Sequence, residues 1–245
     1  MNNSNIDNMR EVRDSIRNGS RFGMSFAIMN CLAGVVATYG LISNSVAVVI
    51  GAMIIATLLA PIMGAGLALV DGSNKLLRDS LIAILGGAVI VLLVSIVSGM
   101  LHYQIPLTEE ILSRTKPNLL DLVIALAAGA AGAYATVTEK VSVGFVGVAI
   151  ATALVPPLAA CGVCIAHGNA ILAGGAFFLF LTNLIAIQSV TSLVLWLYGF
   201  HEISRYLLKP SELLRRNSIS VVVLILLAVM LTLNLRATIE DRNFT

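Results

Sequence analysis

The residues most able to do chemistry in this sequence are prolines and neutral polar groups set inside long apolar runs. Pro61 follows Thr57 in ATLLAPIMGAG, and Pro156 and Pro157 follow Thr152 in ATALVPPLAACG. Proline lacks a backbone N–H and clashes with the carbonyl four residues earlier, so it interrupts a helix. The groups freed there carry partial charge and could bind an ion or a polar solute. We expect a central site at these two interruptions, with ordinary proline kinks as the alternative.

Four further residues are candidates for the same substrate-binding site. Gly64 closely follows the first proline, and a later apolar run holds Thr182, Asn183 and Gln188. An amide in hydrocarbon needs hydrogen-bond partners, which the carbonyls freed by the paired prolines could supply. Hydrogen bonds that join helices, worth at most about 1–2 kcal/mol each, are an equally open interpretation.

Ionisable residues, which mark proton relays and ion pathways in membrane proteins, are almost absent from the apolar runs. Asp121 lies near the end of a run, and His102, Glu139 and His167 lie in loops. This pattern disfavours a carboxylate relay and favours a small ion or a neutral polar solute as the ligand. Motifs of zinc proteases, serine hydrolases and phosphate-binding loops are also missing, so we expect the protein not to be an enzyme.

Cysteine spacing raises one further possibility. Cys161 and Cys164 have C-x-x-C spacing, and His167 follows three residues later. A helix would place all three on one face, where a small metal site is conceivable. We favour packing of buried thiols instead, because no fourth ligand is nearby. We therefore expect no metal, no cofactor and no disulfide framework.

Composition places the chain in a membrane. Of its 245 residues, 58% are hydrophobic and 11% are charged, and the mean hydropathy is +0.95. Soluble domains have about 25% charged residues. The near balance of 15 basic and 13 acidic residues, without a basic stripe, argues against a nucleic-acid partner. Residues 1–21 are polar, so we expect no cleavable secretory signal.

About seven apolar runs approach the roughly 20 residues that a helix needs to cross the hydrocarbon core. They cover approximately residues 22–42, 46–70, 81–101, 119–137, 143–166, 170–200 and 219–235. We expect an all-α integral membrane protein of the cell inner membrane, with the lipid bilayer as its partner. Most Lys and Arg residues fall on the side of the first segment, which predicts a cytoplasmic N-terminus.

A three-helix unit is repeated along the chain. Identical residues recur 96 positions apart, in pairs that include Gly51 and Gly147, Pro61 and Pro157, Gly66 and Gly162, and Gly72 and Gly168. Because the unit has an odd number of spans, its second copy must enter the membrane from the opposite side. Such inverted repeats are typical of secondary transporters and some channels. A duplication that left only a symmetric scaffold is the alternative.

These patterns divide the chain into six segments. They are residues 1–21, a cytoplasmic amphipathic segment; 22–101, the first three-helix repeat; 102–118, an external loop; 119–200, the second repeat; 201–217, a cytoplasmic linker; and 218–245, a C-terminal transmembrane helix and tail. The first segment has apolar residues at helical spacing and either caps the bundle or contacts lipid: Ile6, Met9, Val12 and Ile16. Small residues such as Gly129 and Gly132 predict close helix packing, within the subunit or in a homo-oligomer.

The sequence resembles the family of hydrophobic prokaryotic membrane proteins called domain of unknown function 389. The resemblance covers roughly residues 20–200 and is carried by NSVAVVIGAMIIATLLAPIMGAGLAL, VGVAIATALVPPLAACG and FLFLTNLIAI. Similar sequences have a proline soon after Gly-Ala-Met-Ile-Ile-Ala, where this chain has Thr57. The resemblance implies a membrane protein and supplies no substrate. We expect a transporter or channel; a non-conducting scaffold or sensor subunit and an intramembrane enzyme are the alternatives.

Overall fold

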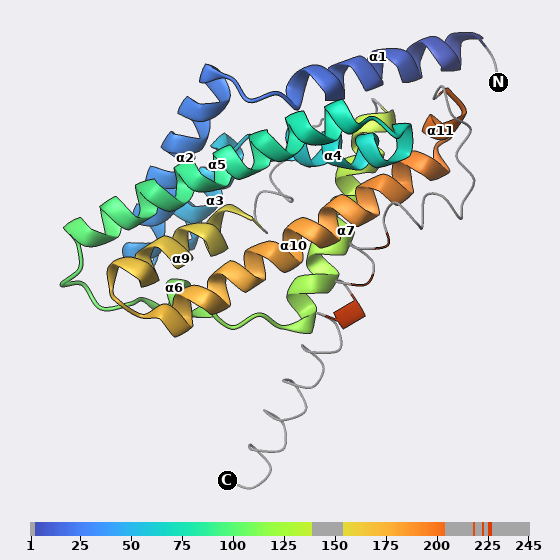
Figure 1. Ribbon diagram of the computed structural model, residues 1–245. Coiled ribbons are helices and arrows are strands. Elements are labelled where there is room, and N and C mark those ends of the chain that lie inside the picture. The colour runs from blue at the N-terminus through green and yellow to red at the C-terminus, as the bar shows by residue number, and fades with distance from the viewer. Residues whose placement is uncertain (1–2, 139–153, 204–217, 219–221, 223–224, 227–245) are drawn as a thin grey trace, which may run out of the picture.

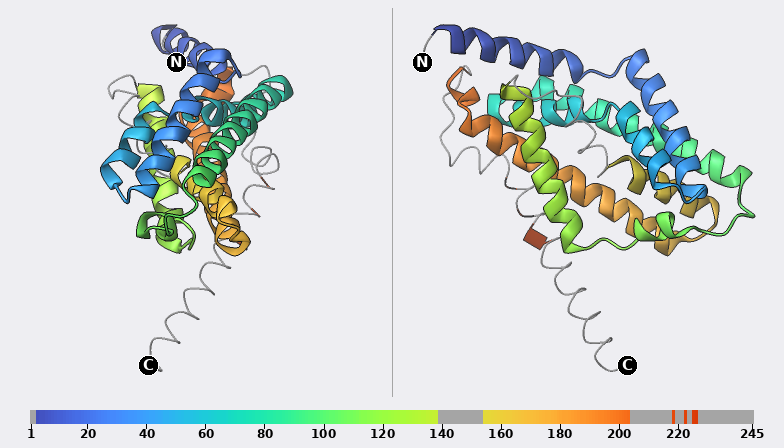
Figure 2. Two further views of the ribbon diagram at one scale, coloured as in Figure 1. Left: turned by 90° about the vertical axis from the view of Figure 1, so that its left-hand side faces the viewer. Right: turned by 180° about the vertical axis from the view of Figure 1, so that it is seen from behind.

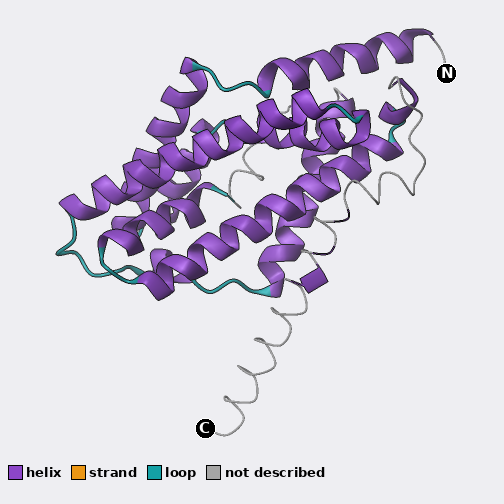
Figure 3. Ribbon diagram, viewed as in Figure 1, coloured by secondary structure: helices purple, strands orange, loops and turns teal. Residues whose placement is uncertain are grey.

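The computed structural model describes residues 3–138 and 154–203, together with positions 218, 222, 225 and 226. Every regular element within those residues is an α-helix, and turns and loops join the helices (Figure 3). Labelled as in Figure 1, the helices are α1 (Asn3–Gly19), α2 (Met24–Ile42), α3 (Val46–Ile55), α4 (Leu59–Asp71), α5 (Asn74–Leu101), α6 (Glu109–Ser113), α7 (Leu119–Thr138), α9 (Val155–Ala166), α10 (Ala170–Leu197) and α11 (Phe200–Ile203).

Several of these helices are candidate membrane spans. Four are long and apolar enough to cross a bilayer, and α3 with α4 makes a fifth candidate, bent by 55° at the junction. The chain is therefore a helical membrane-embedded protein, as its composition predicts. The predicted span at 143–166 is described only from residue 154 onward, where α9 is a short apolar helix. The predicted span at 219–235 lies outside the described residues, apart from isolated positions.

Helices in the two halves of the sequence begin at matching positions. α5 and α10 each contain 28 residues and begin at Asn74 and Ala170, which are 96 positions apart. α4 and α9 begin at Leu59 and Val155, which have the same separation. The separation of 96 residues between identical residues in the sequence is therefore also the separation between these helix starts.

The turns that precede the two long helices also correspond. Gly72, directly after α4, has a φ of 67°, and Gly168, after α9, has a φ of 68°. Glycine adopts this left-handed backbone conformation without steric strain. The next residues, Ser73 and Asn169, cap α5 and α10 by accepting a hydrogen bond from a backbone N–H three residues later. Both turns therefore stop one helix and start the next in the same way.

Each long helix contacts both short helices. α5 packs against α2, α4 and α9, while α10 packs against α7, α9 and α4. α2 and α7 run in opposite directions, and so do α5 and α10 (Figures 1 and 2). Glycines permit close approach within these pairs: Gly34 of α2 lies against Val91 of α5, and Gly129 of α7 lies against Ile187 of α10.

The short helices α4 and α9 are enclosed by protein. Residues 61–68 of α4 and 155–164 of α9 are all buried. The longer helices α2, α5, α7 and α10 instead leave large apolar side chains exposed, among them Met24, Leu85, Leu120 and Ile171. A helix that is apolar all round is stable in an interior, and a helix with an exposed apolar face suits lipid. The long helices therefore shield the short ones from the bilayer.

The amphipathic helix α1 packs on one end of this bundle. Its apolar residues Val12 and Ile16 are buried in a cluster with Met63 and Leu67 of α4 and Phe200 of α11. This face of α1 is therefore covered by protein. Of the two roles predicted for the segment, capping of the bundle fits this packing.

Candidate functional site

The first predicted interruption is a break between α3 and α4. α3 ends at Ile55, Ala56 is extended with a φ of −64° and a ψ of 137°, and α4 begins at Leu59. Pro61 is the third residue of α4 and is buried. The predicted break at Pro61 was therefore misplaced, because the chain breaks before it. The first N–H groups of a helix have no intrahelical partner, so proline is tolerated in the first turn and favours helix initiation there.

The prolines of the second predicted interruption also lie at the start of a helix. α9 begins at Val155, and Pro156 and Pro157 are its second and third residues, both buried. These prolines also lie in a first turn, where their missing N–H groups break no hydrogen bond of the helix. Thr152, the predicted partner of these prolines, lies outside the described residues.

Asn30, a buried residue of α2 that is not among the predicted site residues, forms a hydrogen bond to the break between α3 and α4. Its Nδ2 donates hydrogen bonds of 2.8 Å to Thr57 Oγ1 and of 2.8 Å to the Phe26 carbonyl. The side chain is fully buried, and its Oδ1 has no hydrogen-bond partner among the described residues. An unsatisfied buried amide oxygen is unfavourable by about 1–3 kcal/mol.

This geometry brings together the groups that a polar ligand needs. The C-terminal end of α3 and the N-terminal end of α4 meet at residues 56–58. The last carbonyls of α3 and the first N–H groups of α4 lack hydrogen-bond partners within their own helices. Asn30 adds an amide oxygen, and Thr57 adds a half-buried hydroxyl. All of these groups are neutral. They could bind a small cation through oxygens, or a neutral solute through donors and acceptors.

Gly64 lies in α4, three residues after Pro61, and packs against two serines. A Cβ on Gly64 would overlap Ser20 Oγ and Ser80 Oγ. Ser20 Oγ lies 2.5 Å from the Ile16 carbonyl oxygen and 3.1 Å from the Ala60 carbonyl oxygen, and its single O–H donates to one of them. Ser80 Oγ is buried without a hydrogen-bond partner among the described residues. The absence of a side chain at Gly64 therefore permits a close junction of α1, α4 and α5.

The predicted polar residues of the later run lie on α10. Thr182 is buried and donates a 2.9 Å hydrogen bond to the Phe178 carbonyl of its own helix. Asn183 is also buried, and Gln188 is half-buried. α10 packs against both α4 and α9, so these residues share a helix that touches both short helices. Thr57, between α3 and α4, accepts a hydrogen bond from Asn30 of α2.

The cysteines fit a packing role. Cys161 and Cys164 are free thiols buried in the apolar core of α9. His167 directs both ring nitrogens toward backbone carbonyls, with Nδ1 2.9 Å from that of Val163 and Nε2 3.0 Å from that of Ile105. In residues 3–138 and 154–203, no group of three or more His, Cys, Asp or Glu residues could hold a metal ion.

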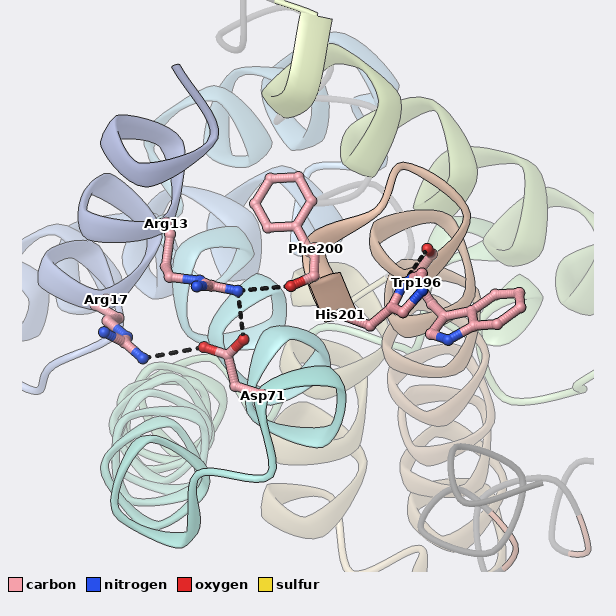
Figure 4. A network of polar contacts seen from close by, with 6 residues as sticks. All are labelled: Arg13, Arg17, Asp71, Trp196, Phe200 and His201. Atoms are coloured by element: carbon pink, nitrogen blue, oxygen red, sulfur yellow. Dashed lines mark hydrogen bonds and ion pairs between the residues drawn. The ribbon is translucent and has the colours of Figure 1, made fainter. Parts of the chain in front are cut away.

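A buried ion-pair network fixes the other end of α4 (Figure 4). Asp71 Oδ1 accepts a 2.7 Å hydrogen bond from Arg13 Nη2, and Asp71 Oδ2 accepts a 3.0 Å bond from Arg17 Nη2. Arg13 Nη2 also donates to the Phe200 carbonyl at 2.7 Å. Burial lowers the pKa of Arg13, and the neighbouring Asp71 opposes that shift. The network joins α1, α4 and α11. It was not predicted from the sequence, where Asp71 adjoins a predicted loop.

Comparisons with known proteins agree with the earlier resemblance. The family described as Domain of unknown function (DUF389) matches residues 53–189, from the end of α3 into α10. An uncharacterized protein of Methanocaldococcus jannaschii is 34% identical over 196 residues. The match covers 79% of this chain and 59% of the relative, so the chain spans about three fifths of that relative's length. No solved structure gives a significant match.

Proposed function

The chain belongs to the DUF389 family, whose description assigns no activity, and we propose that it is a membrane transporter or channel for a small ion or a neutral polar solute. The observation that carries the proposal is the break at residues 56–58, with the buried Asn30 bound to Thr57. Unpaired backbone groups and an unsatisfied amide are unfavourable in an apolar interior. They persist at membrane depth where they line a site or a wet cavity.

The architecture of the proposed transporter is two inverted three-helix repeats, at residues 22–101 and 119–200. Three observations support it: the matching bounds of corresponding helices, the matching turns at Gly72 and Gly168, and the opposite directions of α2 and α7 (Figure 2). Transporters built in this way hold substrate where short helices end at the repeat interface. The enclosed helices α4 and α9 have the character of such short helices.

The full topology of the proposal has about seven spans and a cytoplasmic N-terminus in the cell inner membrane. Arg10, Arg13, Arg17 and Arg21 precede α2, and Lys75 and Arg78 begin α5. Lys and Arg accumulate in cytoplasmic loops, so this end of the bundle is assigned to the cytoplasm. A homo-oligomer is part of the same proposal; Gly129 and Gly132 of α7 are buried within the subunit, so other, exposed residues would form its interface.

The neutral lining of the break sets the ligand class. Asn30 offers its amide oxygen and Thr57 its hydroxyl group, and neither side chain has a formal charge. Such a lining suits a small ion held by partial charges, or a neutral molecule rich in hydroxyl or amide groups. No chemical step is assigned to these residues, so the protein is proposed to move its ligand unchanged.

Flux into proteoliposomes tests the proposal. Purified protein is reconstituted, and the uptake of Na⁺, K⁺, Cl⁻, urea and glycerol is compared with that of protein-free liposomes. We expect at least one of these to enter at a rate about tenfold above the protein-free rate. Absence of uptake for the whole panel, with protein that is folded and correctly inserted, would contradict the proposal.

A non-conducting scaffold or sensor subunit is the second candidate. It is favoured by the burial of Pro61, Pro156 and Pro157, which fill the interior of the bundle. A scaffold needs no open route past these residues. Under this reading, substitution of Asn30 would change stability or partner binding and leave membrane permeability unaltered.

A further inference from the structure

A polar cavity of about 280 Å³ lies where α1 meets the start of α5. Its lining contains three cationic side chains, one carboxylate, one hydroxyl and one apolar residue: Arg17, Arg21, Lys75, Asp79, Ser73 and Leu76. The cavity is separate from the break at residues 56–58 and takes no part in the proposed transport. It opens on the end of the bundle that carries α1.

Charge in the cavity is only partly balanced. Arg17 forms a 3.0 Å ion pair with Asp71, which is not part of the cavity lining. Arg21 and Lys75 are exposed, and neither has an ion pair within 4.0 Å among the described residues. Asp79 is the single carboxylate of the lining. The cavity therefore holds an excess of positive charge and suits an anion.

The start of α5 contributes to the same preference. Ser73 Oγ accepts a hydrogen bond from the N–H of Leu76, and the Ser73 carbonyl accepts one from the N–H of Leu77. The two earlier N–H groups, those of Asn74 and Lys75, have no partner within the helix. The positive end of a 28-residue helix therefore adds donors beside the three cations.

An apolar surface continues from the cavity along α5. Ile82 lies seven residues after Lys75 and three after Asp79, so it is on the same side of the helix. Ile82 is 49% exposed, and Phe22, which is 45% exposed, lies against Gly86 one turn further on. A free phosphate ion would contact the cations alone. A phospholipid would place its headgroup in the cavity and an acyl chain along Ile82 and Phe22.

We propose that this cavity binds the phosphate headgroup of an anionic phospholipid. Arg21, Lys75 and the first N–H groups of α5 contact the phosphate, while Ile82 and Phe22 contact an acyl chain. Basic pockets beside membrane helices bind anionic headgroups in this way. The bound lipid would join α1 to α5 beside the Arg17–Asp71 ion pair.

Native mass spectrometry of the full chain in detergent tests the proposal. The protein is titrated with phosphatidylglycerol and, separately, with phosphatidylcholine. We expect phosphatidylglycerol to bind at least tenfold more tightly. Arg21→Ala and Lys75→Ala should each weaken its binding about fivefold, which is the effect of one cation near a membrane surface. Asp79→Asn should strengthen binding, because it removes the opposing charge.

Matched variants separate headgroup recognition from general attraction and from misfolding. Arg78→Ala removes an exposed cation of α5 outside the cavity lining, and it should leave binding within twofold of the wild type. Lys75→Arg should restore the affinity that Lys75→Ala loses. An equal loss for Arg78→Ala, or no loss for Arg21→Ala and Lys75→Ala, would overturn the proposal.

Two further arms distinguish a lipid from a soluble phosphate. Inorganic phosphate at millimolar concentration should not displace phosphatidylglycerol from the wild type. Ile82→Ser should weaken phosphatidylglycerol binding and leave the low affinity for glycerol phosphate unchanged. Complete displacement by inorganic phosphate would assign the cavity to a soluble anion and contradict the lipid assignment.

Discussion

Gly66 of α4 lies directly against Thr191 of α10, and a Cβ on the glycine would be 2.6 Å from Thr191 Cγ2. The same relationship recurs between α9 and α5, where a Cβ on Gly162 would be 2.6 Å from Ser95 Cβ. Gly66 and Gly162 are 96 residues apart in the sequence, and so are Ser95 and Thr191. Each short helix therefore uses a glycine at the corresponding position to pack against a long helix of the other half of the sequence.

Substitution of these glycines tests whether the two crossings are equivalent. Gly66→Ala and Gly162→Ala should each lower the free energy of unfolding by about 1–3 kcal/mol, because neither crossing has room for a methyl group. Equilibrium unfolding in mixed micelles of mild detergent and dodecyl sulfate measures the change. Thr191→Ser removes the methyl group that Gly66→Ala would meet, so the double variant should recover part of the loss.

Two other helical glycines serve as controls. A Cβ at Gly51 or at Gly174 would meet nothing within 4 Å. Gly51→Ala and Gly174→Ala should therefore leave stability unchanged or raise it by up to about 1 kcal/mol, since alanine is the better helix former. A loss at these positions equal to that at Gly66 would show that helix packing is not the cause.

The ion pairs of Asp71 predict unequal effects for two neighbouring arginines. The Arg13 side chain is 9% exposed, whereas that of Arg17 is 43% exposed. Arg13→Ala leaves a buried carboxylate without its main partner and should destabilise the protein by about 3–5 kcal/mol. Arg17→Ala should lower stability by at most about 1 kcal/mol, because water screens that pair. Thermal unfolding of the two variants in one detergent makes the comparison, and equal losses would contradict it.

The sequence predicted the helical elements better than it predicted the site. The separation of 96 residues between Pro61 and Pro157 is also the separation between the starts of α4 and α9. The break itself was misplaced, because a proline can start a helix as readily as it can disrupt one. The extended Ala56 that ends α3 has no comparable signal in its residue type.

Contacts between residues far apart in the sequence were the hardest to predict. Asn30 lies between apolar residues in α2, and only the fold brings it to Thr57, 27 positions later. Arg13 and Asp71 are 58 positions apart, and each looks like an ordinary surface charge in the sequence. Such pairs depend on packing between helices, which periodicity along one helix cannot specify.

The proposed inverted repeat predicts from which side of the membrane two positions, Asn74 and Ala170, are accessible. Asn74 and Ala170 are the first residues of α5 and α10, and both are exposed. Single cysteines at these positions, in a background without Cys31, Cys161 and Cys164, should react with an impermeant maleimide from opposite sides of the membrane. Asn74→Cys should be labelled from the cytoplasmic side. Labelling of both from one side would contradict the inverted repeat.

Asn30 should separate function from stability. Asn30→Leu removes two hydrogen bonds, each worth about 1 kcal/mol, and it also removes a buried oxygen whose lack of a partner is unfavourable by about 1–3 kcal/mol. The variant should therefore be as stable as the wild type, while losing at least about 90% of the flux measured in proteoliposomes. Thr38→Val is the matched control. It removes a buried hydroxyl that bonds Ser95 at 2.8 Å, away from the break, and it should retain flux. Full flux through Asn30→Leu would show that the break between α3 and α4 is not the transport site.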